Sequence, residues 1–171
     1  ATGGSTLSNL VNVGTGQASG NEVGGIVGTL VNSRLQGTTY NLGAVIASDS
    51  SAVGGLVGRA TNSTIGNENG EVIYNQLNVT GGHEVGGIVG QIDSSTVQNV
   101  ANYGDISAKG SKAEDYQYHT ADKQGTGTSD EVKIVKVKVA NVGGIVGSSA
   151  STKIDGNGVI YSKILNAYNE G

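Results

Sequence analysis

The sequence predicts an all-β fold, a parallel β-solenoid (β-helix) of about five to six coils with about 30 residues each. Three observations predict it: a repeated hexapeptide, a constant spacing behind the hexapeptide, and an asparagine phrase that closes each repeat. The hexapeptide Val-Gly-Gly-Ile-Val-Gly stands at residues 23–28, 85–90 and 142–147, and at 53–58 with Leu56 in place of Ile. Since a phosphate loop or a nucleophile turn is normally used once per domain, a phrase that recurs in this way indicates a structural unit.

The constant spacing is the second observation. A Ser or Thr lies ten residues after the first Val of each hexapeptide, and an aliphatic residue lies twelve after it. The positions are Ser33, Ser63, Ser95 and Thr152, followed by Leu35, Ile65, Val97 and Ile154. Low-complexity chains do not keep such a register, so the pattern predicts order in spite of the 30 Gly residues. We expect two strands joined by a rigid corner.

The asparagine phrase, Asn-x-Gly-x-Val or Asn-x-Gly-x-Ile, is the third observation. It begins at Asn41 and Asn102, Asn12 fits the same template, and Asn75 and Asn166 fit it loosely. The distance to this phrase varies, which predicts a corner that tolerates insertions. In a stack of coils these side chains either form a ladder of hydrogen bonds or are solvated turn residues, and the sequence leaves both open.

The glycines of the hexapeptide need a reason, because Gly inside a strand costs about 0.5–1 kcal/mol relative to Ala. Stacked coils lie about 4.7–4.9 Å apart, so a column of Gly either adopts positive φ at a bend or allows another backbone layer to approach. The alternation does not show which Gly faces inward, whereas Val23, Ile26 and Val27 should supply the interior. The structural glycines are Gly24, Gly25, Gly28, Gly54, Gly55, Gly58, Gly86, Gly87, Gly90, Gly143, Gly144 and Gly147.

With its hexapeptides, the Ser-Thr-Ile/Val-x-Asn segments behind them and the asparagine phrases, the chain resembles the GLUG repeat of large secreted and surface-attached bacterial proteins. These proteins include haemagglutinin-like adhesins and the non-catalytic regions of immunoglobulin A1 metallopeptidases. The resemblance covers most of the chain outside residues 109–138. It implies a parallel β-solenoid used as an extracellular stalk or display surface, and it transfers no catalytic residue because the motif contains none.

Composition narrows the function classes. The 171 residues suit a single domain, residues 1–171, but with no Pro, Cys, Met, Trp or Phe they exclude a globular core built on large aromatics. A net charge of -4 without a basic patch argues against binding to nucleic acid. The lack of Cys excludes disulfides and thiolate metal sites, and no apolar run approaches the roughly 20 residues needed for membrane insertion.

Both ends of the sequence lie inside repeats. The segment 5–9 corresponds to 95–99, and the sequence ends at residue 171 before another hexapeptide is reached. Solenoids normally carry caps that prevent edge-to-edge association. We therefore expect a fragment of a longer array, or a piece that associates end to end.

Residues 109–138 depart from the repeat and read as an inserted β-hairpin. They hold six of the 10 Lys and Arg residues and five of the 14 Asp and Glu residues. Apolar residues alternate with polar ones, and a phase slip at Val135 and Lys136 suits a β-bulge. Because binding residues concentrate on loops carried by rigid scaffolds, this insert is the candidate for partner recognition, against the alternative of a solvated hairpin. The candidate residues are Tyr116, Tyr118, His119, Lys133, Lys136 and Lys138.

Catalytic and metal sites find little support. The glycine phrase lacks the helix and the Lys-Ser/Thr pair of a phosphate loop, and His83 and His119 stand in unrelated contexts without zinc-ligand spacing. The turn 155–158 is a fragment of an oxygen-ligand calcium loop without a closing carboxylate, so a turn is favoured. We expect no cofactor and no metal.

Some parallel β-helices are polysaccharide lyases and hydrolases, which need carboxylates at matched positions of neighbouring coils. Here Asp93 aligns with Val31, Thr61 and Ala150, and Asp105 aligns with Ala44. Glu22 and Glu84 precede two of the hexapeptides, where the other copies have Ala52 and Asn141. No acidic column is predicted, and the chain is expected not to be an enzyme.

The predicted function is a non-catalytic scaffold of a bacterial adhesin, secreted or at the cell surface, that displays loops to a host or neighbouring-cell protein or glycan. The alternative is an accessory region of a secreted metallopeptidase that captures substrate. A downstream His-Glu-x-x-His would favour the alternative, and further repeats or an anchoring domain would favour the first reading. A self-assembling filament subunit is a third possibility.

Overall fold

The structure is a computed structural model that describes residues 1–171 apart from 111, 121–130, 152 and 156–157. For residues 112–120, 131–139 and 154–155 the description covers the backbone. The described residues form strands, turns and loops without a helix, so the all-β prediction is confirmed. In this described part there is accordingly no helix with the length and apolar character needed to cross a membrane.

Four sheets of parallel strands make up the body of the molecule, and successive repeats add strands to them in the same order. Sheet 1 contains β4 (Glu22–Gly24), β9 (Ala52–Gly54), β14 (Glu84–Gly86) and β20 (Asn141–Gly143). Sheet 2 contains β5 (Val27–Val31), β10 (Val57–Thr61), β15 (Val89–Asp93) and β21 (Val146–Ala150). Each hexapeptide thus begins in sheet 1 and ends in sheet 2, with the corner between them.

Sheets 3 and 4 are formed by the rest of each repeat. Sheet 3 contains β1 (Thr6–Ser8), β2 (Val11–Asn12), β6 (Arg34–Gln36), β7 (Tyr40–Asn41), β11 (Thr64–Ile65), β12 (Ile73–Asn75), β16 (Thr96–Asn102) and β24 (Lys163–Asn169). Sheet 4 contains β3 (Gly16–Gln17), β8 (Val45–Ala47), β13 (Val79–Gly81) and β17 (Ile106–Ala108). Sheet 3 has two strands per repeat except in the longer β16 and β24, where the chain passes both positions without a break.

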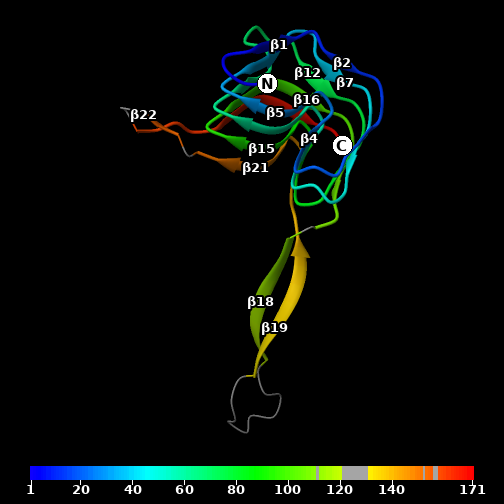
Figure 1. Ribbon diagram of the computed structural model, residues 1–171, viewed down its shortest axis with the longest axis vertical. Coiled ribbons are helices and arrows are strands. Elements are labelled where there is room, and N and C mark those ends of the chain that lie inside the picture. Colours follow the sequence, from blue (N-terminus) through cyan, green and yellow to red (C-terminus); the bar gives the residue numbers. More distant parts are fainter. Residues whose placement is uncertain (111, 121–130, 152, 156–157) are drawn as a thin grey trace.

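The register is the decisive feature, because residues pair with their own counterparts one repeat away. Val53 pairs with Val23 on one side and with Val85 on the other. The corner residues also follow in one file, since the Ile26 N–H donates to the Leu56 carbonyl at 3.0 Å and the Leu56 N–H donates to the Ile88 carbonyl at 3.0 Å. Figure 1 shows the resulting curled layers of strands. A solenoid-like stack of parallel strands, as the repeat predicts, is therefore what the chain forms.

The interior contains two separate apolar clusters. One lies between sheets 2 and 3 and includes Leu30, Leu56 and Ile65, each fully buried. The other lies between sheets 1 and 4 and includes Val53 and Val79. The predicted interior positions are confirmed, since Ile26 packs against the first cluster, Val27 belongs to it, and Val23 packs against the second.

Close approach, rather than positive φ, explains the glycines of the hexapeptide. None of the twelve has a positive φ, and a Cβ built on any of them would lie less than 3.0 Å from a neighbouring atom. On Gly54, for example, it would lie 2.1 Å from the Val57 carbonyl oxygen and 2.7 Å from that of Ile88 in the next layer. The positive φ angles fall elsewhere, at corners such as Asn32, Asn62 and Ser94 (each φ 48°).

The constant spacing behind the hexapeptide fails in the fourth copy. The Ser33 N–H donates to the Ser63 Oγ (3.1 Å) and the Ser63 N–H to the Ser95 Oγ (3.0 Å), but the Ser95 N–H donates to the Ser162 Oγ (3.3 Å). Ser162 therefore occupies the position that the spacing predicts for Thr152, a residue outside the described part of the chain. Similarly, Val97 pairs with Ile164 rather than with Ile154.

An extra segment at the corner causes this failure. β22 (Ile154–Asp155) pairs antiparallel with β23 (Gly158–Val159), and this short hairpin leaves the stack before β24 rejoins it. Ser151-Thr-Lys-Ile154 has the spacing of the repeat, but Ser162-Lys-Ile164-Leu-Asn166 takes its place. The prediction of a rigid corner thus fails in the fourth repeat, where this corner carries an insertion. Spacing alone selected the wrong one of two similar segments.

The predicted insert is confirmed as a hairpin. β18 (Lys112–Thr120) and β19 (Glu131–Val139) pair antiparallel and extend away from the stack (Figure 1). The Gly110 N–H donates to the Gly82 carbonyl and the Asn141 N–H to the His83 carbonyl, so the chain leaves the stack at residue 110 and returns by residue 141. The predicted bulge at Val135 and Lys136 is wrong, because every residue of one strand has a single opposite residue in the other.

Candidate partner-binding surfaces

The asparagines of the repeat form a continuous ladder of hydrogen bonds through the stack. In each step the Nδ2 of one Asn donates to the Oδ1 of the next at 2.7 or 2.8 Å. Its members are Asn12, Asn41, Asn75, Asn102 and Asn169, of which Asn41, Asn75 and Asn102 are fully buried. Each Nδ2 also donates to the carbonyl two residues further along its own chain segment. Of the two readings that the sequence left open, the ladder is correct.

Asn166 does not belong to this ladder. It sits at a corner with a φ of 48°, and its Nδ2 donates to the Asn99 Oδ1 at 3.2 Å. Asn169 occupies the ladder position, because β24 pairs Asn169 with Asn102. A signal for this was present in the sequence, since Tyr168-Asn169 repeats the Tyr-Asn pairs at residues 40–41 and 74–75 and Asn169-Glu-Gly171 is an Asn-x-Gly phrase.

The second glycine of each hexapeptide lies against the ladder asparagine of its own repeat. A Cβ on Gly25 would lie 2.7 Å from the Asn41 Cγ, and one on Gly87 would lie 2.4 Å from the Asn102 Cγ. The two most repeated phrases of the sequence thus meet inside the stack, between the two apolar clusters. The inward-facing glycine that alternation could not identify is the second one.

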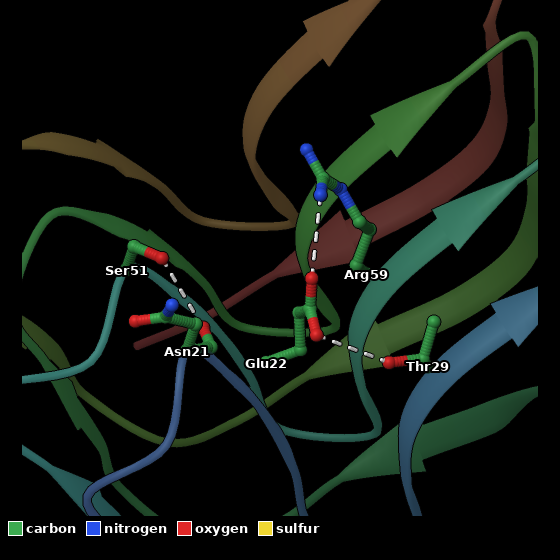
Figure 2. Close-up of polar contacts among 5 residues, drawn as sticks. All are labelled: Asn21, Glu22, Thr29, Ser51 and Arg59. Atoms are coloured by element: carbon green, nitrogen blue, oxygen red, sulfur yellow. Dashed lines mark hydrogen bonds and ion pairs between the residues drawn. The ribbon is translucent and has the colours of Figure 1, made fainter.

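Charged residues on the outside of the stack form isolated surface pairs. Glu22 receives a hydrogen bond from the Arg59 Nη1 at 3.3 Å and one from the Thr29 Oγ1 at 3.4 Å, as Figure 2 shows. Both charged side chains are partly exposed, at 36% and 42%. Exposed pairs of this kind are worth about 0–1 kcal/mol, so this pair adds little to the stability of the stack.

No acidic column appears among the described residues. Asp93 pairs with Thr61 on one side and with Ala150 on the other, and Ala52 separates Glu22 from Glu84. His83 is half-buried at the corner from which the long hairpin leaves. Within the described part of the chain, no three His, Asp or Glu residues come together in a group that could hold a metal ion. The predicted turn at 155–158 lies partly outside the described residues.

Tyrosines form a second surface feature, which the sequence reasoning missed. Tyr40 and Tyr74 stack with ring centroids 5.0 Å apart and an interplanar angle of 12°. Tyr103 meets Tyr74 edge-on at 6.0 Å, and Tyr168 follows Tyr103 at 6.1 Å. Each of these tyrosines is a direct neighbour of a ladder Asn in the sequence, and since strand residues alternate between faces, an inward Asn places its neighbours outside. That adjacency was the signal available in the sequence.

This tyrosine file lies along the outside of sheet 3 and becomes more exposed toward the C-terminal strand. Tyr40 and Tyr74 are half-buried, whereas Tyr103 is 40% and Tyr168 is 54% exposed. Beside Tyr40 and Tyr74 lies a shallow groove of about 250 Å³ that Glu71 and Val72 also line. The rings pack on each other across the repeats, so the file stabilises the stack as well as presenting aromatic surface.

The predicted recognition residues all lie on the long hairpin, which brings them together as one ribbon. Its register places Tyr116 opposite Val135, Tyr118 opposite Lys133 and Asp115 opposite Lys136. His119 lies opposite Val132, and Lys138 lies opposite Ala113. The structure thus carries the six predicted residues away from the stack on one projecting element (Figure 1).

Comparisons with models of known protein families, with curated proteins and with solved structures gave no match. The GLUG resemblance therefore stays a prediction based on the motif.

Proposed function

We propose that this chain is a non-catalytic scaffold segment of a bacterial protein, secreted or at the cell surface, which presents the β18–β19 hairpin to a partner. The repeated residues have a structural role, because asparagines, serines and glycines bind or contact residues of the next repeat. The proposed solenoid has one repeat per coil and about five coils, at the low end of the range expected from about 30 residues per coil. A stack of this kind is a rigid base for a displayed element.

The observation that carries the proposal is the hairpin itself. Its two nine-residue strands pair only with each other and extend from the corner between β17 and β20. They bring Tyr116 and Tyr118 away from the stack together with charged residues. Tyrosines are enriched at the centre of recognition surfaces, and charged residues suit the polar rim. The proposed partner is a protein or glycan of a host or neighbouring cell, in line with the adhesins that the motif resembles.

The hairpin can be removed at a defined point. Because Gly110 and Asn141 donate to the carbonyls of the consecutive residues Gly82 and His83, joining Gly110 to Asn141 continues the repeat without it. The variant that lacks residues 111–140 should keep the strand content and thermal stability of the stack. It is a matched control for everything that the hairpin binds.

Attachment of protein-coated fluorescent beads to cultured epithelial cells tests the proposal. Beads that carry the intact chain should attach, and beads that carry the variant without residues 111–140 should fall to the level of albumin-coated beads. Sialidase and N-glycanase treatment of the cells then separates a glycan partner from a protein partner. Equal attachment of the two variants, or no attachment of the intact chain, contradicts the proposal.

A further inference from the structure

The long hairpin is a ribbon of only two strands. β18 and β19 form a sheet of their own, and neither joins any sheet of the stack. An isolated two-stranded ribbon is marginally stable in water and normally needs a third strand or a packed face. We therefore expect the ribbon to pack against a second surface that stabilises it, and the pattern of its residues indicates which surface that is.

The register assigns each residue to one of two faces of the ribbon. Residues directly opposite each other share a face, and successive residues alternate between faces. The face that contains Tyr116 and Val135, here the Tyr116 face, also contains Tyr118, Val137 and Val139. The opposite face contains Ala113, Asp115, Gln117, His119, Val132, Ile134, Lys136 and Lys138. Both faces therefore carry apolar residues, and the Tyr116 face holds both tyrosines and three of the four valines of the ribbon.

The charges of the Tyr116 face follow an ordered pattern from the base of the ribbon to its tip. The first cross-strand pair carries the positive Lys112 and the second carries the negative Glu114. The third is the uncharged pair Tyr116 and Val135 at the centre. The fourth carries the positive Lys133 and the fifth the negative Glu131.

When the order of the five pairs is reversed, each positive pair takes the place of a negative pair and each negative pair takes the place of a positive one. When two such faces pack antiparallel, the Lys112 pair lies opposite the second copy's Glu131 pair, and the Glu114 pair lies opposite the second copy's Lys133 pair. The uncharged central pair then lies opposite itself. A surface that is complementary to its own copy after a half-turn is what a two-fold dimer interface requires.

We propose that two copies of this chain associate through the Tyr116 face of β18 and β19, packed face to face and antiparallel about a two-fold axis at the Tyr116–Val135 pair. Packing in the same direction would place Lys112 opposite Lys112 and Glu114 opposite Glu114, which is unfavourable. The opposite face has no such pattern, since its Lys138 has no acidic counterpart at the far end, where the pair is His119 and Val132. The proposal rests on the scaffold role given above and makes a second copy a partner of the hairpin.

Charge-reversal variants test it. Glu114→Lys alone places like charges opposite each other in two places of a homodimer, and so does Lys133→Glu alone. Each single variant should raise the dimer dissociation constant at least tenfold in sedimentation equilibrium of the full chain. An equimolar mixture of the two should recover association, because the second copy then supplies the opposite charge at every pair. Lys136→Glu, a matched change on the opposite face, should leave the dissociation constant unchanged.

Several results would overturn the inference: an intact chain that stays monomeric up to about 1 mM, single variants that dimerise like the intact chain, or a mixture that does not recover. Circular dichroism of each variant verifies that the stack remains folded. Bead attachment separates this inference from the proposed function. If monomeric variants still attach to cells, the dimer is not needed for attachment and the proposed function stands. If the intact chain forms dimers but does not attach, the proposed function fails and only the self-association is supported.

Discussion

Gly55 lies directly against Asn75 inside the stack. A Cβ on Gly55 would lie 2.4 Å from the Asn75 Cγ and 2.2 Å from the Gly87 carbonyl oxygen of the next layer. Asn75 in turn donates to Asn102 and accepts from Asn41, so the glycine makes room for the ladder. The hexapeptide and the asparagine phrase therefore depend on each other, because the glycine of one leaves the space that the asparagine of the other occupies.

This relationship predicts that Gly55→Ala destabilises the protein strongly. The new methyl group has no space, since backbone of the next layer and a hydrogen-bonded Asn surround it, and overpacking of this kind costs about 1–3 kcal/mol or more. Urea unfolding followed by circular dichroism measures the change. Gly20→Ala is the control, because a Cβ there meets nothing within 4 Å and should change the free energy of unfolding by less than about 0.5 kcal/mol. Equal effects at the two positions would contradict the close-approach explanation.

Asn75→Ala should lower the free energy of unfolding by about 2–4 kcal/mol, because it interrupts the ladder where it is buried. The Asn41 Nδ2 loses the bond to Asn75 and keeps the one to the Gly43 carbonyl, and the Asn102 Oδ1 loses the Asn75 donor. Asn12→Ala, at the half-buried N-terminal end of the ladder, removes one step and should cost about 1 kcal/mol. If both substitutions had the same small effect, the ladder would contribute nothing beyond solvated turns.

How much the sequence predicts depends on whether a feature recurs with an unchanged pattern of residues. The hexapeptide does, so the pairing of Val23, Val53 and Val85 follows from sequence alone. The ladder does not follow, because an Asn that bonds only to its own turn and one that also bonds to its counterpart in the next repeat fit the same phrase. The tyrosine file was missed because its members do not keep one position in the repeat: Tyr74 precedes its ladder Asn, whereas Tyr103 follows its own. Both rings meet on the outer face because the Asn beside each of them faces inward.

The hairpin shows a similar limit. Alternation predicts its two strands, but the slip at Val135 and Lys136 is not a bulge. Val135 shares a face with Val137 and Lys133, and Lys136 shares the other with Ile134, so the residue types change along each face while the register stays regular. A change in residue type along a strand therefore looks the same in the sequence as a bulge, and only the cross-strand pairing tells the two apart.

The segment 152–161 should be dispensable. Joining Ser151 to Ser162 gives Ala150-Ser151-Ser162-Lys163-Ile164, which matches residues 93–97 position by position. We expect this deletion to leave the midpoint of thermal unfolding within a few degrees of the intact chain, because β24 keeps its pairing with β16. Scanning calorimetry measures it.

Two matched substitutions examine the same register. Ser162→Ala should lower the unfolding midpoint, since the Ser95 N–H loses its acceptor, whereas Thr152→Ala should not change it. The reverse result would mean that Thr152, as the constant spacing predicts, holds the column position after all.

The tyrosine file should stabilise the stack through pairwise ring contacts. Tyr74→Leu removes the stacked contact with Tyr40 and the edge contact with Tyr103, and aromatic pairs contribute about 0.5–1.5 kcal/mol each beyond the area that they bury. We expect a loss of about 1–3 kcal/mol in urea unfolding. Tyr74→Phe keeps both rings in contact and should cost less than about 0.5 kcal/mol.

A double-mutant cycle isolates the ring contact itself. Tyr40→Leu combined with Tyr74→Leu should give a coupling energy of about 0.5–1.5 kcal/mol, because both single changes remove the same stacked pair. Tyr161, 69% exposed, gives the control, and Tyr161→Leu combined with Tyr74→Leu should be additive. Additivity in both cycles would mean that Tyr40 and Tyr74 stabilise the stack separately, through the surface that each buries, and that the file has no energetic role as a unit.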